Sequence, residues 1–496
     1  MEVIYGENVD IKSIFYDKES DLKSCFVEIT DSCNFRCSHC YIPHQHRKII
    51  SFSMFKRVID QLAELGCQNL LITGGEPFIH PDFCEMYSYA YNKIKFISIN
   101  TNMSLLNDNI LNLFLTKKPY SIEVSLYGYD EKSYYEFTNV CNMYEKVLNN
   151  IEIIKKNDIP ILLKIPLTTL SIKYIDKIIE FANSRCLFLK FDYVIFPQLD
   201  HLTERCNNTR LMPKQIINFL SKNIVTINFC YNAVKKRNND WNENLFSCIA
   251  GKEAIYIDSY GYIKMCMVTD RMELNINNNK IKDALLVFSK QRDNLKFDTS
   301  NVCKNCDKKN ICRYCPGRFK LEMGDYQKHP SWYCNVANTI INYDWCKRFY
   351  VYADKVTVNN YVKDMFNIIK ENQNGTDEDY EVWKENNIDN WKYKMILCIY
   401  NNRVIGYLEY YEEKDYYYWC EVQIDKNYQG DKKTLVGLYN EFININNEKK
   451  SIRGRINNDH SVDVHKHIGF KNEKDNFYII SYDNLKKWVS MHNNID

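Results

Sequence analysis

Three cysteines lie close together near the start of the chain, in the segment Cys33-Asn-Phe-Arg-Cys37-Ser-His-Cys40. They follow the apolar run 25–30, whose composition is typical of a β-strand, so we expect them on the loop where that strand ends. Three thiolates on one short loop can hold three irons of a 4Fe–4S cluster and leave the fourth iron open to a small molecule. The alternative is a structural zinc site, which needs four closed ligands and would take His39 or His44 as the fourth.

Seven further cysteines follow in the second half of the chain: Cys248, Cys266, Cys303, Cys306, Cys312, Cys315 and Cys334. Their number and spacing indicate metal ligands. A zinc ribbon built on the two C-x2-C pairs is one alternative, but it would leave Cys248, Cys266 and Cys334 without a role. Most of the other ten of the 20 cysteines lie within or beside apolar patterns, and we interpret them as core thiols.

The composition narrows the class of protein. A hydrophobic content of 45% indicates a globular chain, and a net charge of +2 gives no general attraction to nucleic acid or to an anionic membrane. The N-terminus lacks the features of a signal peptide, and no apolar run approaches the ~18 residues needed to span a bilayer. We therefore expect a soluble, cytoplasmic protein with no nucleic-acid or membrane partner. In a reducing compartment, 20 cysteines indicate metal binding rather than disulfides.

Between residues 24 and 197, short β-rich apolar runs alternate with amphipathic stretches such as 53–65 and 144–156. The predicted strands are 25–30, 69–73, 95–100, 121–126, 161–167 and 187–196. Successive strand–helix units predict an α/β fold with parallel strands and right-handed crossovers. The active site of such a sheet lies at the carboxyl ends of its strands. The pattern is compatible with a closed barrel and with an open one.

Glycine and polar residues stand at the ends of these strands. They are Gly74, Gly75, Glu76 and Pro77 after the second strand, Asn100 and Asn102 after the third, and Ser125 after the fourth. Taken singly, each of these residues is also common in turns, and the alternative interpretation is that they have only this structural role. Glycine lets the backbone approach a ligand closely, and Glu76 offers an acceptor for an ammonium group. Lys164 on the fifth strand could reach a carboxylate bound there, and a solvated or cluster-screening lysine is the alternative.

Together these residues resemble the radical S-adenosylmethionine (SAM) family. The three-cysteine loop followed by the aromatic Tyr41 matches the family signature, and the segment 74–77 matches its GGEP motif for the SAM amino group. The resemblance implies a partial (β/α)6 barrel, a 4Fe–4S cluster on the three cysteines, and SAM bound at the open iron. It also implies that Asn100, Asn102 and Ser125 contact the ribose and methionine parts of SAM.

The second cysteine framework resembles the SPASM extension of radical SAM enzymes, which carries auxiliary iron–sulfur clusters. By this resemblance, one auxiliary cluster is held by Cys303, Cys306, Cys312 and Cys334, and the other by Cys248, Cys266 and Cys315. The chain has two residues between Cys312 and Cys315, where the family pattern has three. Since the second set has three members, we expect an open iron or a ligand from elsewhere in the chain.

Residues 355–496 resemble the acetyltransferase fold of the GNAT superfamily, with an α+β pattern and an antiparallel sheet. Active relatives cradle the pyrophosphate of acetyl-CoA in a glycine-rich turn. The corresponding turn here, 429–434, has Lys432 and Thr434 where small residues are expected, and His465 aligns with the usual tyrosine acid. We therefore expect this domain to have a structural, binding or docking role. The alternative is that it is an active acetyltransferase.

The sequence thus predicts four parts: a lead-in at 1–20, a radical SAM barrel at 21–238, a SPASM-like segment at 239–350 and a GNAT-like domain at 355–496. The predicted function is a peptide maturase that cleaves SAM reductively and abstracts hydrogen from a peptide or protein to install a crosslink. Its expected partners are that substrate and an electron donor such as flavodoxin or ferredoxin. Only 32 residues precede Cys33, so peptide recognition is expected from the C-terminal domain or a separate protein. The alternatives are a formylglycine-forming sulfatase maturase, a small-molecule-modifying enzyme and a non-catalytic cluster-bearing scaffold.

Overall fold

The computed structural model describes most of the chain. The described residues are 3–5, 22–43, 48–222, 224–236, 243–270, 274–353, 358, 361–372, 380–385, 393–430, 432–446, 448–456 and 459–492. The lead-in at 1–20 apart from residues 3–5, the candidate zinc ligand His44 and position 431 of the C-terminal turn lie outside them. The chain divides into two compact units, residues 1–216 with 237–338, and residues 217–236 with 339–496.

The first unit is built on a sheet in the order β1-β7-β6-β5-β4-β3-β2-β8-β9. Its strands are β1 Val3–Tyr5, β2 Ser24–Thr30, β3 Asn69–Gly74, β4 Phe96–Thr101, β5 Ser121–Ser125, β6 Ile161–Pro166, β7 Phe188–Asp192, β8 Ala254–Ile257 and β9 Ile263–Lys264. Strands β2 to β7 run parallel in chain order, as the sequence predicts. The sheet ends in β1 and β9 and is therefore open. The predicted strand 187–196 is shorter than expected and stops at Asp192.

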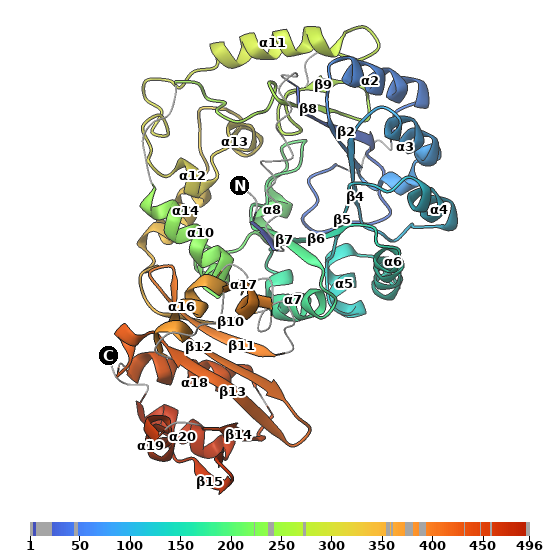
Figure 1. The fold of residues 1–496 in the computed structure, drawn as a ribbon. Helices are drawn as coiled ribbons and strands as arrows, with labels where there is room; N and C mark the ends of the chain where they lie inside the picture. The colour runs from blue at the N-terminus through green and yellow to red at the C-terminus, as the bar shows by residue number, and fades with distance from the viewer. Residues whose placement is uncertain are drawn as a thin grey trace. The chain divides into compact units, whose positions relative to one another are not determined.

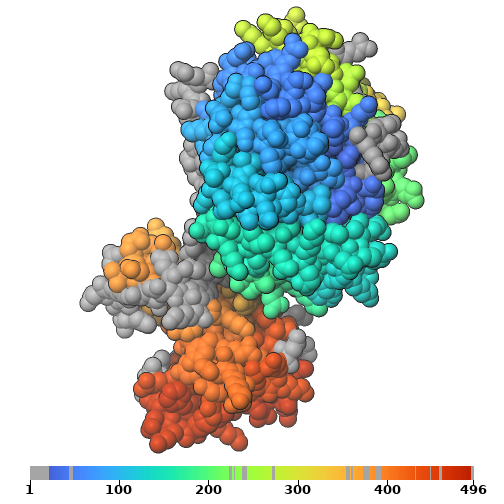
Figure 2. Space-filling model, turned by 90° about the vertical axis from the view of Figure 1, so that its right-hand side faces the viewer, coloured from blue at the N-terminus to red at the C-terminus, as the bar shows by residue number. Residues whose placement is uncertain are grey.

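Helices follow the strands of this unit. They are α2 Phe52–Glu64, α3 Phe83–Tyr91, α4 Asp108–Thr116, α5 Glu131–Thr138, α6 Tyr144–Lys156, α7 Ile175–Ser184, α8 Glu204–Thr209, α11 Ile281–Asn294, α12 Lys309–Cys312 and α13 Pro316–Met323, with 3-10 turns η1 Pro77–Ile79 and η2 Ser171–Tyr174. Helices α9 Pro213–Leu220 and α14 Ser331–Asn342 begin in this unit and end in the second. Helices α2, α3, α4 and α6 follow one another along the outside of the sheet (Figure 1) and form the blue-to-cyan face in Figure 2. Among the described residues, no helix has the length and apolarity that a bilayer crossing requires.

Helix α2 illustrates how the sequence sets these elements. Its buried side chains are Phe55, Val58, Ile59 and Leu62. This spacing of three and four residues places one apolar stripe against the sheet. Ser51 is the N-cap of the helix, and its side chain accepts a hydrogen bond from the backbone N–H of Met54.

The cysteine-rich segment contributes to the same sheet, which the sequence did not predict. Strand β8 pairs in parallel with β2, and β9 forms an antiparallel pair with β8. All four residues of β8 are buried. A four-residue strand within a loop-rich region carries too little periodicity to be recognised in the sequence. Its pairing brings the segment after residue 254 to the edge of the barrel beside the cysteine loop.

The second unit contains a sheet in the order β10-β11-β12-β13-β14-β16-β15. Its elements are α10 Ile224–Lys235, β10 Phe349–Ala353, α16 Val362–Asn372, α17 Tyr380–Lys384, β11 Lys394–Tyr400, β12 Arg403–Glu412, β13 Tyr416–Ile424, η4 Lys426–Tyr428, α18 Lys432–Ile445, β14 Ser451–Arg455, α19 Asp459–Ile468, β15 Lys471–Lys474, β16 Phe477–Ile480 and α20 Tyr482–His492. Neighbouring strands are antiparallel, as predicted, except for the parallel pair β13 and β14. An apolar core lies between this sheet and helices α18 and α20.

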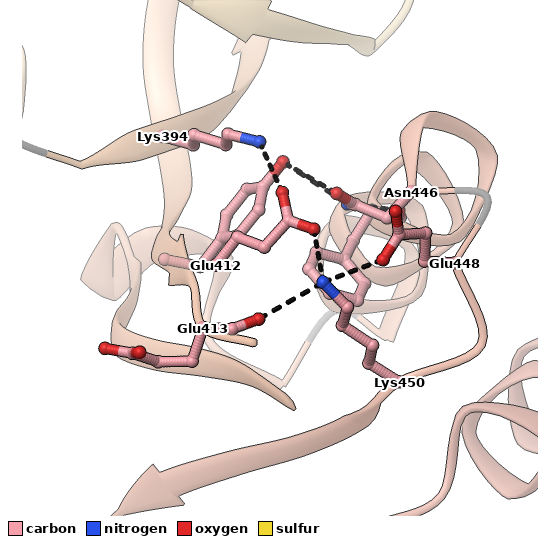
Figure 3. A network of polar contacts seen from close by, with 8 residues as sticks. Lys394, Glu412, Glu413, Asn446, Glu448 and Lys450 are labelled. Carbon is pink, nitrogen blue, oxygen red and sulfur yellow. Dashed lines mark hydrogen bonds and ion pairs between the residues drawn. The ribbon is translucent and has the colours of Figure 1, made fainter. Parts of the chain in front are cut away.

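A network of charged side chains holds the end of the β12–β13 hairpin to the start of β14 (Figure 3). The Lys450 ammonium lies 2.7 Å from Glu412 Oε1 and 2.7 Å from Glu448 Oε2, and it donates to the Glu413 carbonyl at 3.1 Å. Lys394 approaches the other oxygen of Glu412 at 3.1 Å. Because Glu412, Glu448 and Lys394 remain partly exposed, the network orients the hairpin more than it stabilises the fold.

Candidate functional site

A cavity of about 270 Å³ lies at the carboxyl ends of the parallel strands. The sequence-predicted residues that line it are Cys33, Cys37, Cys40, Tyr41, Gly74, Gly75, Asn100, Asn102 and Ser125. They come from the ends of β2, β3, β4 and β5, so neighbouring parallel strands bring together residues that are up to 92 positions apart. Glu76 and Pro77 do not line this cavity and are buried beside it.

The cysteine loop is held by hydrogen bonds to two other parts of the barrel. The backbone N–H groups of Arg36 and Ser38 donate to the carbonyls of Thr138 and Phe137 at the end of α5, at 2.9 and 3.0 Å. On the other side, the Asn102 amide donates to Asn34 Oδ1 at 2.9 Å and lies 3.8 Å from Cys33 Sγ. These hydrogen bonds hold the cysteine loop from two sides.

The three thiols of this loop share a desolvated environment. Burial raises the pKa of the Cys33 thiol to about 12, and it raises the pKa values of Cys37 and Cys40 as well. The thiols also act on one another, since Cys40 raises the pKa of Cys33, and both raise that of Cys37. Soft sulfur donors that resist ionisation unless a cation compensates them fit an iron–sulfur cluster.

The two glycines after β3 are required by the packing of one loop against another. A Cβ at Gly74 would lie 2.2 Å from the Thr30 carbonyl oxygen, and one at Gly75 would lie 2.2 Å from that of Ser32. Gly74 also has a φ of +148°, which side chains rarely adopt. From the sequence, we interpreted these glycines as positions where the backbone approaches the ligand closely. The structure adds that they let the β3 turn lie directly against the cysteine loop.

Glu76 is fully buried and connects two of these loops. Its carboxylate accepts hydrogen bonds from Thr101 Oγ1 and the Asn102 N–H, both at 2.7 Å, and from the Phe78 N–H at 3.1 Å. Burial raises the pKa of this carboxyl to about 7, although the three hydrogen bonds oppose the shift. In this structure the acceptor expected for an ammonium group is occupied by protein donors that fix the end of β4.

Aromatic rings form much of the cavity wall. Tyr41 stacks on Phe196 with ring centroids 5.3 Å apart, and Tyr127 stacks on Phe137 at 4.9 Å. The ring of His39 also lines the cavity, and its buried Nδ1 has no hydrogen-bond partner among the described residues. Burial lowers the pKa of His39 to about 4, so the ring is neutral at pH 7. Sequence reasoning considered His39 as a zinc ligand alone, although its place between two cysteines of the loop was a signal.

Lys164 of β6 lines the cavity. Its ammonium lies 3.0 Å from Glu123 Oε2 and donates to Asn100 Oδ1 at 3.3 Å. The lysine is therefore paired with neighbours on β5 and β4 and orients Asn100 at the cavity wall.

Four of the later cysteines gather in one place. The pKa of Cys303 is raised to about 11 and that of Cys312 to about 12, chiefly by burial, and the thiols of Cys306 and Cys334 contribute to both shifts. A short turn at 303–306 and helix α12 bring three of them together, and α14 carries Cys334. These are the four that the sequence analysis grouped, and four thiols are a complete donor set for a cubane cluster.

The remaining three cysteines of the framework form a second group. Burial raises the pKa of Cys266 to about 11, with further contributions from Cys315 and Cys248. Gly317, two residues after Cys315, packs against Val268, two residues after Cys266, because a Cβ at Gly317 would lie 2.8 Å from Val268 Cγ2. Cys248 is exposed, so this group opens to solvent on one side. Among the described residues, no three His, Cys, Asp or Glu side chains are arranged to hold a single metal ion.

Comparison with known proteins agrees with this geometry. Residues 27–182 match the Radical SAM superfamily. The chain is 36% identical over 93 residues to the antilisterial bacteriocin subtilosin biosynthesis protein AlbA of Bacillus subtilis, a match that covers 18% of this chain and 21% of AlbA. It is 22% identical over 345 residues to the AdoMet-dependent heme synthase of Methanosarcina barkeri, covering 62% of this chain and 94% of that protein.

The fold is also found in a solved structure, native anSMEcpe with bound AdoMet and the Cp18Cys peptide. The TM-score is 0.50 at 17% sequence identity, over 64% of this chain and 96% of anSMEcpe. The chain therefore carries a radical SAM domain and is a radical SAM enzyme. Proteins of this superfamily bind a 4Fe–4S cluster and SAM.

Proposed function

We propose that this enzyme is a peptide maturase, which abstracts hydrogen from a peptide or protein and installs a crosslink or a related modification. The observation that carries the proposal is that three loop thiols and six predicted SAM contacts line one cavity, while the other seven framework cysteines form two separate groups. A SAM pocket accompanied by two further clusters of cysteine side chains suits a reaction that needs both a radical and additional redox or binding sites.

In this proposal Cys33, Cys37 and Cys40 hold the cluster that binds SAM. When bound, the cluster and SAM supply the 5′-deoxyadenosyl radical. Gly74 and Gly75 expose backbone at the SAM amino group, and Asn100, Asn102, Ser125 and Tyr41 line the pocket for the rest of the cofactor. Glu76 acts indirectly, because it fixes the backbone of Asn102, and Pro77 begins the 3-10 turn η1 that follows it.

The auxiliary part of the proposal assigns one cluster to Cys303, Cys306, Cys312 and Cys334. A second cluster is assigned to Cys248, Cys266 and Cys315, and its fourth iron is open or is bound by another residue. The exposure of Cys248 supports an open position that a substrate thiol or hydroxyl can reach. The electron that starts the reaction comes from a flavodoxin or ferredoxin.

A second cavity supports a substrate site beside the SAM pocket. Its volume is about 530 Å³, and it shares Ile42 with the first cavity. Glu28 of β2 lines one side, and Met267 and Val268, which directly follow Cys266, line another. A peptide side chain in this space would lie between the SAM pocket and the group formed by Cys248, Cys266 and Cys315. The likeness to AlbA, a bacteriocin biosynthesis protein, and to anSMEcpe, which binds a peptide, supports a peptide as the substrate.

We assign a GNAT-like fold to the C-terminal part, supported by the parallel pair β13 and β14 joined through α18 within an otherwise antiparallel sheet. Thr434 stands where active relatives have a small residue, and it is fully buried, with its Cγ2 3.1 Å from the position of a Cβ at Gly406. We therefore expect the full chain to bind no acetyl-CoA in isothermal titration calorimetry. Saturable binding would instead support acetyl transfer by this domain.

A small-molecule substrate is the second candidate, favoured by the match that covers 94% of the heme synthase. The two are separated by incubating the reconstituted enzyme with SAM, a reductant and either a candidate precursor peptide or a porphyrin. Mass spectrometry of the peptide then reports loss of hydrogen on crosslinking, and absorbance reports porphyrin conversion.

The cofactor assignment is tested by anaerobic reconstitution. The wild-type chain should bind about 12 irons, four for each of three cubane clusters. The variant with Cys33, Cys37 and Cys40 changed to alanine should keep about eight irons and produce no 5′-deoxyadenosine on reduction. Retained SAM cleavage in that variant would refute the assignment.

A further inference from the structure

Lys309 lies buried within the four-cysteine group. It occupies the run between Cys306 and Cys312, begins the short helix α12, and is only 2% exposed. Its ammonium donates to the Lys304 carbonyl at 3.0 Å and lies 4.4 Å from the centroid of the Phe297 ring. Its own carbonyl accepts a bond from Cys312 Sγ at 3.5 Å. The lysine is therefore fixed by packing and hydrogen bonds on both its backbone and its side chain.

A buried ammonium group is costly unless negative charge compensates it. Burial lowers the pKa of Lys309, and the groups that oppose this shift are the thiols of Cys303, Cys306 and Cys312. The neighbouring Lys308 is less buried and donates to Asn338 Oδ1 at 2.8 Å. Of these two adjacent lysines, Lys309 is thus the fully buried one, and its backbone carbonyl contacts the Cys312 sulfur.

We propose that Lys309 is a positioning residue that supplies the positive counter-charge of the iron–sulfur cluster held by Cys303, Cys306, Cys312 and Cys334. This inference rests on the proposed function. On reduction the cluster takes up one electron from a low-potential donor, such as dithionite or a flavodoxin, and no bond or proton changes. Because the cluster becomes more negative, a fixed ammonium beside it favours the reduced form and raises the reduction potential.

The test uses full-length protein carrying Cys33→Ala, Cys37→Ala and Cys40→Ala, in which the two auxiliary clusters remain. An EPR-monitored redox titration measures both, and Cys306→Ala identifies the signal of the four-cysteine site. We expect Lys309→Met to lower the equilibrium constant for reduction of this cluster about tenfold. For a one-electron couple, this lowers the reduction potential by about 59 mV. Lys309→Arg should retain the wild-type potential, and Lys308→Met should shift it less than Lys309→Met does.

The second auxiliary cluster serves as the internal reference, and its potential should not move. Equal shifts in Lys309→Met and Lys309→Arg would overturn the inference, as would no shift in Lys309→Met or a larger one in Lys308→Met. If Lys309→Met fails to take up iron at this site, iron retained by Lys309→Arg supports the role of charge, and loss in both variants overturns it. A parent protein with no iron at the four cysteines would refute the proposed auxiliary clusters themselves.

Discussion

The substitution Gly75→Ala tests whether the radical SAM pocket depends on direct contact between two loops. The new Cβ would lie 2.2 Å from the Ser32 carbonyl oxygen and 2.8 Å from that of Asp31, where ordinary contact begins at 3.4 Å. The loops must therefore separate by about 1 Å, and they can do so only by moving backbone. Ser32 directly precedes Cys33, so the displacement reaches the first of the three thiols.

The magnitude follows from two contributions. Overpacking of this kind costs about 1–3 kcal/mol. The Gly75 N–H donates to the Thr30 carbonyl and the Glu76 N–H to the Ser32 carbonyl, both at 2.8 Å. Weakening one of these bonds adds about 1 kcal/mol. We expect Gly75→Ala to lower the free energy of unfolding of the barrel by about 2–4 kcal/mol in total.

The assays are iron content after anaerobic reconstitution, 5′-deoxyadenosine formed on reduction, and urea unfolding. We expect loss of the first cluster and of SAM cleavage, with about eight auxiliary irons retained. Gly454→Ala is the matched control, because its Cβ would meet its nearest atom, the Trp419 carbonyl oxygen, at 3.3 Å. Wild-type iron content and SAM cleavage in Gly75→Ala would refute the reasoning, since the two loops would then not need to touch.

Two further predictions concern buried charge. Arg210 and Glu322 form a two-bonded ion pair at 2.8 and 2.5 Å, with side chains 5% and 12% exposed, so Arg210→Met should cost about 3–5 kcal/mol in urea unfolding. The double variant with Glu322→Met should recover much of this loss, and equal destabilisation would contradict the buried-charge explanation. Burial and the facing Glu421 raise the pKa of Glu409 from 4.5 to about 7, so its contribution to stability is present below about pH 4.5 and is lost as the pH rises to 7. At pH 8, Glu409→Gln should therefore stabilise the C-terminal unit by about 1–3 kcal/mol, measured by hydrogen exchange, whereas the exposed Glu413→Gln should have no effect.

Much of the fold was predictable because its signals are local. The stripe of Phe55, Val58 and Leu62 marks α2 within a dozen residues, and each strand of the barrel is a short apolar run. The cysteine loop was equally clear, since its three cysteines and the strand before them are close together in the sequence. Strand β8 escaped prediction, because four residues become a strand only when the distant β2 supplies their hydrogen-bond partners.

The sequence predicted which residues belong to the candidate site better than it predicted the role of each residue. Gly75 is placed correctly at the cavity, yet the atom that forbids a side chain there belongs to Ser32, 43 residues earlier. Glu76 was interpreted as a ligand acceptor, and the structure turns it toward Thr101 and Asn102 instead. Spacing in the sequence gives no information on which of several loops at a sheet edge will pack together.

Residue types and spacing alone identified the three-cysteine loop and the polar strand ends of the radical SAM domain, because these signals are contiguous in the chain. Only folding brought the three thiols and the polar strand ends to one cavity, turned Glu76 toward the backbone of Asn102, and buried Lys309 more deeply than Lys308. The physical reason is that ligand type is a property of single residues, whereas burial and charge compensation arise when segments far apart in the chain exclude water together.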